Sequence, residues 1–173
     1  RPERGLLRKR CIMIAKLSPL QWNSYVLLQS YFQLTEAPKD GPQQILPADI
    51  FHDYIIDVDF RVNKESTGEW QVFAKVQVNW EEPVKTGYRL YVEGVGRFSI
   101  QDEEKLEKDK LQNMAYYSTV NIMINRLRAH ITELTASSIL GAYTLPAIDI
   151  TDLFKQKAEL VAKGKAKKTV SKK

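Results

Sequence analysis

The side chains that most often carry chemistry in proteins are few in this sequence and scattered along it. Cys11 is the single cysteine, and the two histidines, His52 and His130, fall in different predicted elements. Asp57 and Asp59 share one face of a predicted strand, which is the pattern of a solvated face. A structural zinc site needs four clustered ligands. We therefore expect no metal site.

No motif for catalysis or cofactor binding accompanies these residues. The segment Gly94-Val95-Gly96-Arg97 has two of the glycines of a dinucleotide-binding loop, but it lacks the third glycine and the helix that should follow. Catalytic triad residues lie far apart in sequence, which leaves a Ser/His/Asp arrangement open, but no nucleophile elbow or phosphate-loop pattern is present. We expect a protein that is not an enzyme, has no catalytic residues and needs no cofactor.

Large apolar residues in a loosely patterned strand and in loops are the more unusual feature of the chain. Such side chains can line a binding groove, or they can cover the ends of a core or a subunit contact. Both interpretations stay open, because both surfaces are built from the same residue types. The candidate groove residues are Tyr25, Leu27, Tyr31, Phe51, Tyr143, Leu145 and Ile148.

Charge is distributed unevenly along the 173 residues. The tail 155–173 carries eight lysines and one glutamate, and the head 1–10 carries five basic residues and one glutamate. Because the whole chain has a net charge of +5, residues 11–154 carry −6. An acidic body argues against a nucleic-acid-binding face within the fold. Nucleic acid could be bound only through the basic tail, which we interpret as a disordered, solubilising terminus.

The apolar segments and the cysteine content indicate a cytoplasmic protein. No window approaches the roughly 18 consecutive apolar residues of a membrane span. The segment 6–17 has basic flanks, but its apolar runs are too short for a secretory signal. A lone Cys11 provides no disulfide framework.

Alternating apolar residues predict four strands joined mainly by short turns. A loop over 37–48, with three prolines and a glycine, separates the first strand from the others. Four such strands make an antiparallel sheet with one apolar face that needs a cover. The predicted strands span residues 25–34, 54–62, 70–80 and 88–100.

The cover is predicted to be a long helix from Leu106 to about Ala136. Apolar residues recur there at intervals of three and four. The helix would be about 45 Å long, which exceeds the width of a four-stranded sheet, so we expect a second subunit to pack on it. The residues predicted at that interface are Val120, Ile124, Leu127 and Ile131. Gly141 ends the pattern, and a second, shorter helix is predicted to begin near Asp149.

Three segments of the sequence resemble the SecB chaperone family. Residues 93–100 are similar to the end of that family's fourth strand, and residues 121–124, followed by Arg128 and Ile131, resemble its long helix. Residues 145–154 resemble the segment that leads into its second helix, and this match is the most specific. The resemblance covers roughly residues 23–162 and implies a SecB-like α+β fold. It divides the chain into a basic head (1–17), a chaperone domain (18–162) and a basic tail (163–173).

The resemblance also implies a function. Members of the family are ATP-independent holdases, typically tetramers built as dimers of dimers, that bind unfolded clients along apolar grooves. Two departures bear on the client: export-type members have a proline where this chain has Asn125, and they lack a lysine-rich tail. The expected client is therefore either an antitoxin of a toxin–antitoxin system or an exported preprotein, and binding to the export motor is uncertain. The alternative is an α+β enzyme or ligand-binding domain with a pocket between sheet and helix.

Overall fold

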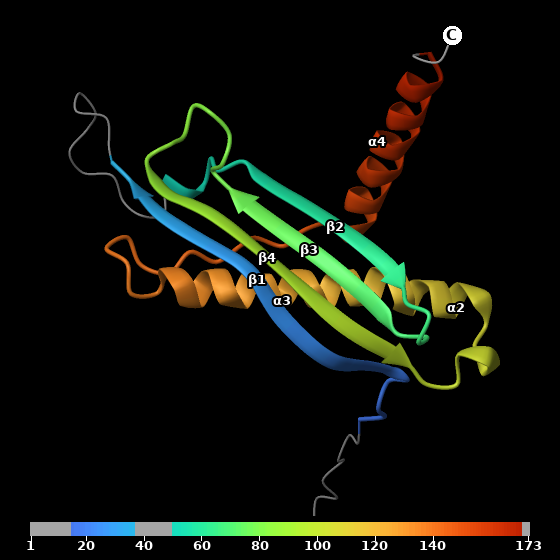
Figure 1. Cartoon of the computed structure of the whole chain (residues 1–173). Helices are drawn as coiled ribbons and strands as arrows, with labels where there is room; N and C mark the ends of the chain where they lie inside the picture. The colour runs from blue at the N-terminus through green and yellow to red at the C-terminus, as the bar shows by residue number, and fades with distance from the viewer. Residues whose placement is uncertain (1–14, 37–49, 171–173) are drawn as a thin grey trace, which may run out of the picture.

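One open antiparallel sheet forms the centre of the computed structural model, which describes residues 15–36 and 50–170 (Figure 1). Most of the predicted head and the whole predicted loop 37–48 lie outside these ranges. The sheet has the order β1-β4-β3-β2. Its strands are β1 (Leu20–Thr35), β2 (Ile56–Lys64), β3 (Trp70–Val78) and β4 (Gly87–Ile100). This four-stranded sheet, together with a long helix and a C-terminal helix, confirms the predicted α+β fold.

Strand β3 shows why the sheet could be predicted. Its alternate residues Val72, Ala74, Val76 and Val78 are fully buried, while the residues between them are only partly buried. The strand ends two residues earlier than predicted because Asn79 adopts a left-handed conformation with φ of 53° and its side-chain amide donates hydrogen bonds to the carbonyl oxygens of Lys85 and Tyr88. The turn therefore begins within the predicted strand.

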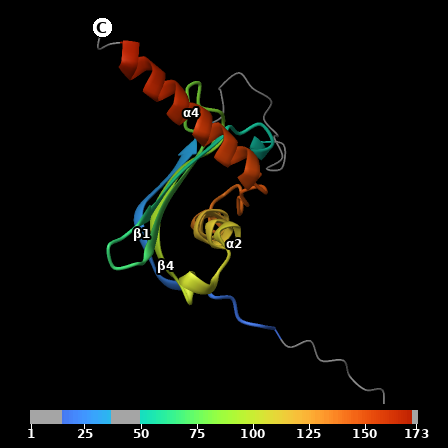
Figure 2. The same cartoon turned by 90° about the vertical axis from the view of Figure 1, so that its right-hand side faces the viewer.

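The long helix runs without a break from Lys108 to Thr135 and lies on the concave side of the curved sheet (Figure 2). It consists of α2 (Lys108–Gln112), a π-helical segment η2 (Asn113–Ser118) and α3 (Thr119–Thr135), after a short 3-10 turn η1 (Glu103–Lys105). Helix α3 packs on β3 and β4. It is thus the predicted cover of the apolar face.

The four residues predicted at a subunit interface lie in the core of the single chain. Val120, Ile124, Leu127 and Ile131 are at most 1 % exposed between α3 and the sheet. In this arrangement they offer no surface to a second copy. The physical reason is that the apolar stripe of a helix first covers the sheet of its own chain, so a regular stripe marks the core rather than an interface.

Strand β1 lies at the edge of the sheet and is largely uncovered. It pairs with β4, and two register shifts, after Trp22 and after Leu27, turn its side chains from one face to the other. The second shift lies opposite Gly94, where an added Cβ would come within 2.7 Å of the Tyr25 ring. This glycine inside the fourth strand thus allows the close approach of the Tyr25 ring. Exposed apolar side chains line β1: Trp22, Val26, Leu27, Leu28, Tyr31 and Leu34.

The connector between α3 and α4 is fixed by polar contacts. The guanidinium of Arg128 donates to the carbonyl oxygens of Leu145 and Pro146, at 2.8 and 2.9 Å. The backbone N–H of Tyr143 donates to the Thr135 hydroxyl at 2.8 Å. These bonds hold the connector along α3.

Helix α4 (Ile150–Val170) begins where the sequence predicts. The Asp149 carboxylate accepts a hydrogen bond from the backbone N–H of Asp152 at 3.0 Å, which is an N-cap. The helix then projects away from the sheet (Figures 1 and 2) and continues to Val170, past the predicted start of the tail at Lys163. No helix in the described part of the chain is long and apolar enough to cross a membrane.

Candidate functional site

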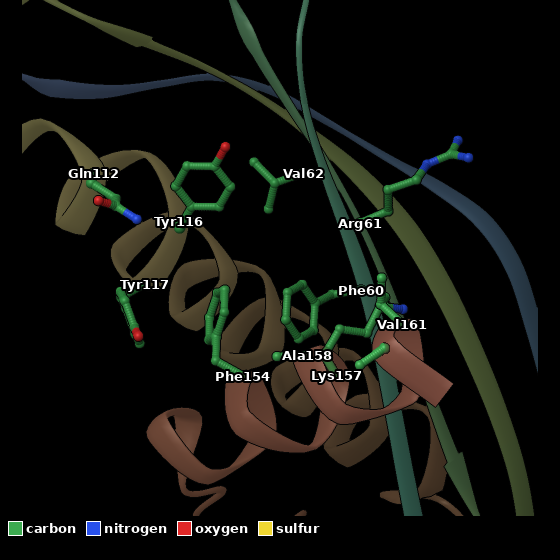
Figure 3. Close-up of a pocket in the computed structure, with 11 residues that line it drawn as sticks. Phe60, Arg61, Val62, Gln112, Tyr116, Tyr117, Phe154, Lys157, Ala158 and Val161 are labelled. Atoms are coloured by element: carbon green, nitrogen blue, oxygen red, sulfur yellow. The ribbon is translucent and has the colours of Figure 1, made fainter. Parts of the chain in front are cut away.

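An open apolar groove of about 720 Å³ lies where α4 meets the strand β2 and the start of the long helix. We call it the α4 groove. Figure 3 shows side chains from these three elements around it. Its lining residues are Phe60, Arg61, Val62, Gln112, Tyr116, Tyr117, Phe154, Lys157, Ala158, Val161 and Ala162.

Closely packed, mutually tilted aromatic rings form the base of the α4 groove. The ring centroids of Phe154 and Phe60 are 4.6 Å apart, and those of Phe154 and Tyr117 are 4.4 Å apart. Phe60 is buried, whereas 37 % of Tyr117 is exposed. Tyr116 also lines the groove and packs edge-on against Trp70, with ring centroids 5.6 Å apart. A continuous aromatic surface therefore leads from the core to solvent.

Each element presents its aromatic side chain for a local reason. Phe60 lies on the helix-facing side of β2, opposite Ala74 of β3. The π-helical segment η2 inserts an extra residue into the helical period, and Tyr116 and Tyr117 lie within it. Phe154 lies in the first turns of α4, so the N-cap that starts the helix also sets the position of this ring.

An ion pair fastens α4 to the edge of the sheet beside the groove. The ammonium of Lys157 donates a hydrogen bond to the Asp59 carboxylate and lies 5.7 Å from the centroid of the Phe60 ring. Burial alone would raise the pKa of Asp59. The Lys157 ammonium, the Phe60 backbone N–H and the charge of Lys75 outweigh burial and hold that pKa below its usual range.

Three of the predicted groove residues lie on β1 and not in the α4 groove. The Tyr25 ring faces α3, and the guanidinium of Arg126 lies 5.0 Å from its centroid. Tyr31 lies on the opposite face of the sheet, edge-on to Trp80 at 5.4 Å. Leu27 is exposed on the strand opposite Gly94. These residues line the edge of the sheet on both of its faces.

The other four predicted groove residues lie at or near the connector. Phe51 and Tyr143 pack with ring centroids 5.2 Å apart and line a smaller hollow of about 390 Å³. Leu145 is fully buried, and Ile148 is half-buried against the core. Burial, and secondarily the neighbouring Tyr54, raises the pKa of Tyr143 to about 12. This group thus mainly completes one end of the core, and only Phe51 and Tyr143 of the four line a hollow.

Sequence reasoning missed the aromatic residues that form the α4 groove. Phe60 lies within the predicted strand 54–62, Tyr117 within the predicted long helix, and Phe154 within the predicted second helix, so the patterns alone give these residues no binding role. One signal was available: Tyr116 and Tyr117 are adjacent, and neighbours in a helix point about 100° apart. Such a pair covers a wide arc of the helix surface and favours exposure of one ring, although the adjacent residues Met123 and Ile124 are both buried.

The described part of the chain gathers no group of three His, Cys, Asp or Glu side chains that could hold a metal ion. The groove is lined by aromatic, aliphatic and cationic groups. Such a surface can bind apolar side chains of another molecule, and this requires no bond to form or break.

Comparison with known proteins finds likeness in structure alone. No family model matches the sequence, and no curated protein matches it. The structure is similar to that of the SecB-like chaperone Rv1957 of Mycobacterium tuberculosis, solved in complex with a ChAD peptide from the antitoxin HigA1: 17 % identity, a TM-score of 0.49, and coverage of 75 % of this chain and 91 % of that one. It is also similar to a protein of unknown function from Streptococcus agalactiae, with 10 % identity, a TM-score of 0.37, and coverage of 74 % and 97 %.

Proposed function

We propose that this protein is an ATP-independent chaperone, a holdase, that binds unfolded segments of client polypeptides in the α4 groove. The observation that carries the proposal is the aromatic base of the groove, where the exposed ring of Tyr117 packs on the half-buried ring of Phe154. The resemblance to the SecB family of residues 93–100, of residues 121–124 with Arg128 and Ile131, and of residues 145–154 supports it. The protein would act in the cytoplasm.

The groove suits weak and reversible binding. Burying one large apolar side chain contributes about 1.5–3 kcal/mol, and an unfolded client loses conformational freedom when it is held. A segment that inserts two or three apolar side chains would therefore bind and be released without nucleotide. Because the base is apolar rather than a set of fixed hydrogen-bonding groups, it would accept many sequences.

We propose an antitoxin of a toxin–antitoxin system as the preferred client class, with exported preproteins as the alternative. Helix α3 passes through Asn125 without a break, at the position where export-type members of the family have a proline. The lysine-rich end of α4 is a second departure from those members. Binding to the export motor therefore forms no part of the proposal.

We propose that the exposed edge of β1 joins copies of the chain, as the first step toward a dimer of dimers. β1 is a 16-residue edge strand whose described pairing is to β4 alone. Its apolar side chains are exposed on both faces, and such an edge readily adds another strand. Tyr25, Leu27 and Tyr31 would then border a subunit contact, the second of the two interpretations open from the sequence.

An aggregation assay tests the chaperone proposal. The purified chain, without nucleotide, should suppress the light scattering of a chemically unfolded enzyme diluted into buffer, at a chaperone-to-client ratio near one. Serum albumin at the same concentration is the control for non-specific protection. No suppression beyond that of albumin, together with a monomeric mass by light scattering, would instead support the ligand-binding alternative.

A further inference from the structure

The basic head of the chain joins the fold at the end of the molecule where the long helix begins. The carbonyl oxygen of Pro19 accepts a hydrogen bond from the backbone N–H of Gln101 at 3.0 Å, just before the turn η1 that leads into the long helix. Figure 1 shows the start of β1 at this end of the sheet, where α2 also lies. Gln112 and Tyr117, near the start of the long helix, line the α4 groove. The head therefore starts at the end of the molecule that carries the helical wall of the groove.

The head is long enough to extend along that wall. Residues 1–14 precede the described part of the chain, and Leu6 is nine residues from Ala15, a span of up to about 30 Å when the chain is extended. From Lys108 to Tyr117 the long helix rises by only about 14 Å. The difference of about 15 Å remains for passing the turn η1, which is compact because the backbone N–H of Lys105 donates to the carbonyl oxygen of Asp102 at 2.9 Å.

The sequence of the head carries side chains of the kind that an apolar groove binds. Leu6 and Leu7 form one apolar run, residues 11–14 (Cys-Ile-Met-Ile) form a second, and the basic triplet 8–10 (Arg-Lys-Arg) separates the two. Leu17, which lies in the described part of the head, is 87 % exposed. Apolar side chains of this size lose free energy when an apolar surface covers them. The head is thus itself a potential occupant of the α4 groove.

The turn between the head and the groove is acidic. Residues 102–110 carry five carboxylates and three lysines. Asp102 pairs with Lys105, and Glu103 pairs with Lys64. Within the described residues, no ion-pair partner accompanies the other carboxylates, which are exposed: Glu104, Glu107 and Asp109. A head that passes this turn would bring its basic triplet beside them, and the net charge of +4 on residues 1–10 complements the −6 of residues 11–154.

We propose that the head occupies the α4 groove of its own chain when no client is bound, with Leu6 and Leu7 on the aromatic base and the triplet 8–10 beside the acidic turn. The proposal rests on the proposed holdase function and adds a regulation of the same site. Because the head belongs to the same chain, it competes with clients at a fixed, high effective concentration. A head that fills about nine in ten grooves lowers the apparent affinity for a client about tenfold.

Fluorescence anisotropy with the full-length chain tests this competition. The probe is a labelled neutral peptide with a Phe-Leu-Tyr anchor between glutamines. Leu6→Asp combined with Leu7→Asp should bind the peptide about tenfold more tightly than the parent chain. Lys172→Gln combined with Lys173→Gln is the matched control, since it changes the net charge equally at the other end of the sequence, and it should bind as the parent does. Equal tightening in both variants would assign the effect to charge and overturn the head as occupant.

A photocrosslink locates the head directly. Cys11→Ala combined with Gly5→Cys places the single thiol of the chain next to Leu6, where it is labelled with benzophenone maleimide. After illumination, the label should be attached to the fragments that contain Tyr117 or Ala158, in a product with the mass of one chain. An excess of the unlabelled neutral peptide should suppress this product. A product with the mass of two chains would place the head in the groove of a second copy and overturn occupancy within one chain.

The outcomes separate this inference from the proposed function. If the peptide binds the parent and the Leu6→Asp, Leu7→Asp variant with equal affinity, the head does not compete for the groove, and the holdase proposal stands. Crosslinks that avoid both walls of the groove lead to the same conclusion. If the peptide binds neither chain while the crosslink to Tyr117 forms, the head occupies the groove and the holdase proposal fails.

Discussion

The ring of Phe154 in α4 lies against the ring of Phe60 in β2, with centroids 4.6 Å apart. This contact and the neighbouring pair Lys157–Asp59 hold the base of α4 on the edge of the sheet. Farther along the helix, Leu160 and Val161 are 66 % and 49 % exposed. Helix α4 is thus docked at its first turns and more exposed farther along, and the groove extends from the docked turns to Ala162.

Replacing Phe154 by Ala should undock α4. We expect the free energy of unfolding to fall by about 1–3 kcal/mol, less than for a fully buried phenylalanine because this ring is only partly buried. Hydrogen exchange should become faster in α4 while β3 and β4 stay protected. Leu160→Ala is the control, since Leu160 is exposed on the same helix. Unchanged exchange in α4 would show that the ring contact does not hold the helix.

Acid should weaken the attachment of α4 through Asp59. The pKa of this carboxyl is lower in the folded chain than its ordinary value of 3.8, so its stabilisation is complete above about pH 4 and is lost as the pH falls below that value. Both side chains of the pair are substantially exposed, so the contribution is about 0.5 kcal/mol.

The measurement compares unfolding free energies at pH 7 and pH 3 for the parent chain and for Asp59→Asn. Between pH 7 and pH 3, the free energy of unfolding of the parent should fall by about 0.5 kcal/mol more than that of the variant. Leu160→Ala serves as the control: it removes no titrating group, so its free energy of unfolding should fall between pH 7 and pH 3 by as much as that of the parent. If the free energies of unfolding of Asp59→Asn and of the parent fall equally in acid, the ion pair does not contribute to stability.

Replacing Gly94 by Ala should destabilise the sheet through the Tyr25 ring. The added Cβ would come within 2.7 Å of that ring, and overpacking of this kind costs about 1–3 kcal/mol. The double variant Gly94→Ala with Tyr25→Ala removes the obstacle and should lose less stability than the two single losses added together. Urea denaturation measures all four chains. If the loss of stability in the double variant equals the sum of the two single losses, the two residues do not interact.

Cationic substitutions on β1 should break the oligomer without unfolding the chain. Lysine on an edge strand opposes pairing with another strand, so Val26→Lys combined with Leu28→Lys should lower the mass measured by light scattering to that of a single chain. Ile139→Lys is the control, because Ile139 is exposed outside β1. If the β1 variant keeps its oligomeric mass, the subunits meet elsewhere.

The fold could be predicted from the sequence because its patterns are local. The alternation in β3 and the helical spacing of Val120, Ile124 and Leu127 each require only a few neighbouring residues to recognise. The start of α4 could be predicted for the same reason, since the side chain of Asp149 caps the helix three residues before Asp152.

The candidate site could not be predicted in the same way, because three elements distant in sequence form it. Phe60 has the same alternation as Val58 and Val62 in its strand, and only the position of α4 makes it part of a groove. Leu145 lies in a loop by sequence but is buried, because Arg128 holds the connector along α3. Whether an apolar residue is exposed thus depends here on tertiary packing.

The most direct test of the client groove compares two tyrosines of nearly equal exposure. Tyr117 lines the α4 groove and is 37 % exposed, whereas Tyr31 on β1 is 40 % exposed. Each is replaced by Ser, which leaves the backbone edge of β1 free to pair; light scattering measures the oligomeric mass of both variants, and suppression of client aggregation is compared at equal mass. We predict that Tyr117→Ser protects the client several-fold less well than the parent chain, while Tyr31→Ser protects it equally well. Full protection by Tyr117→Ser, or loss of protection in Tyr31→Ser alone, would contradict the assignment of the α4 groove as the client site.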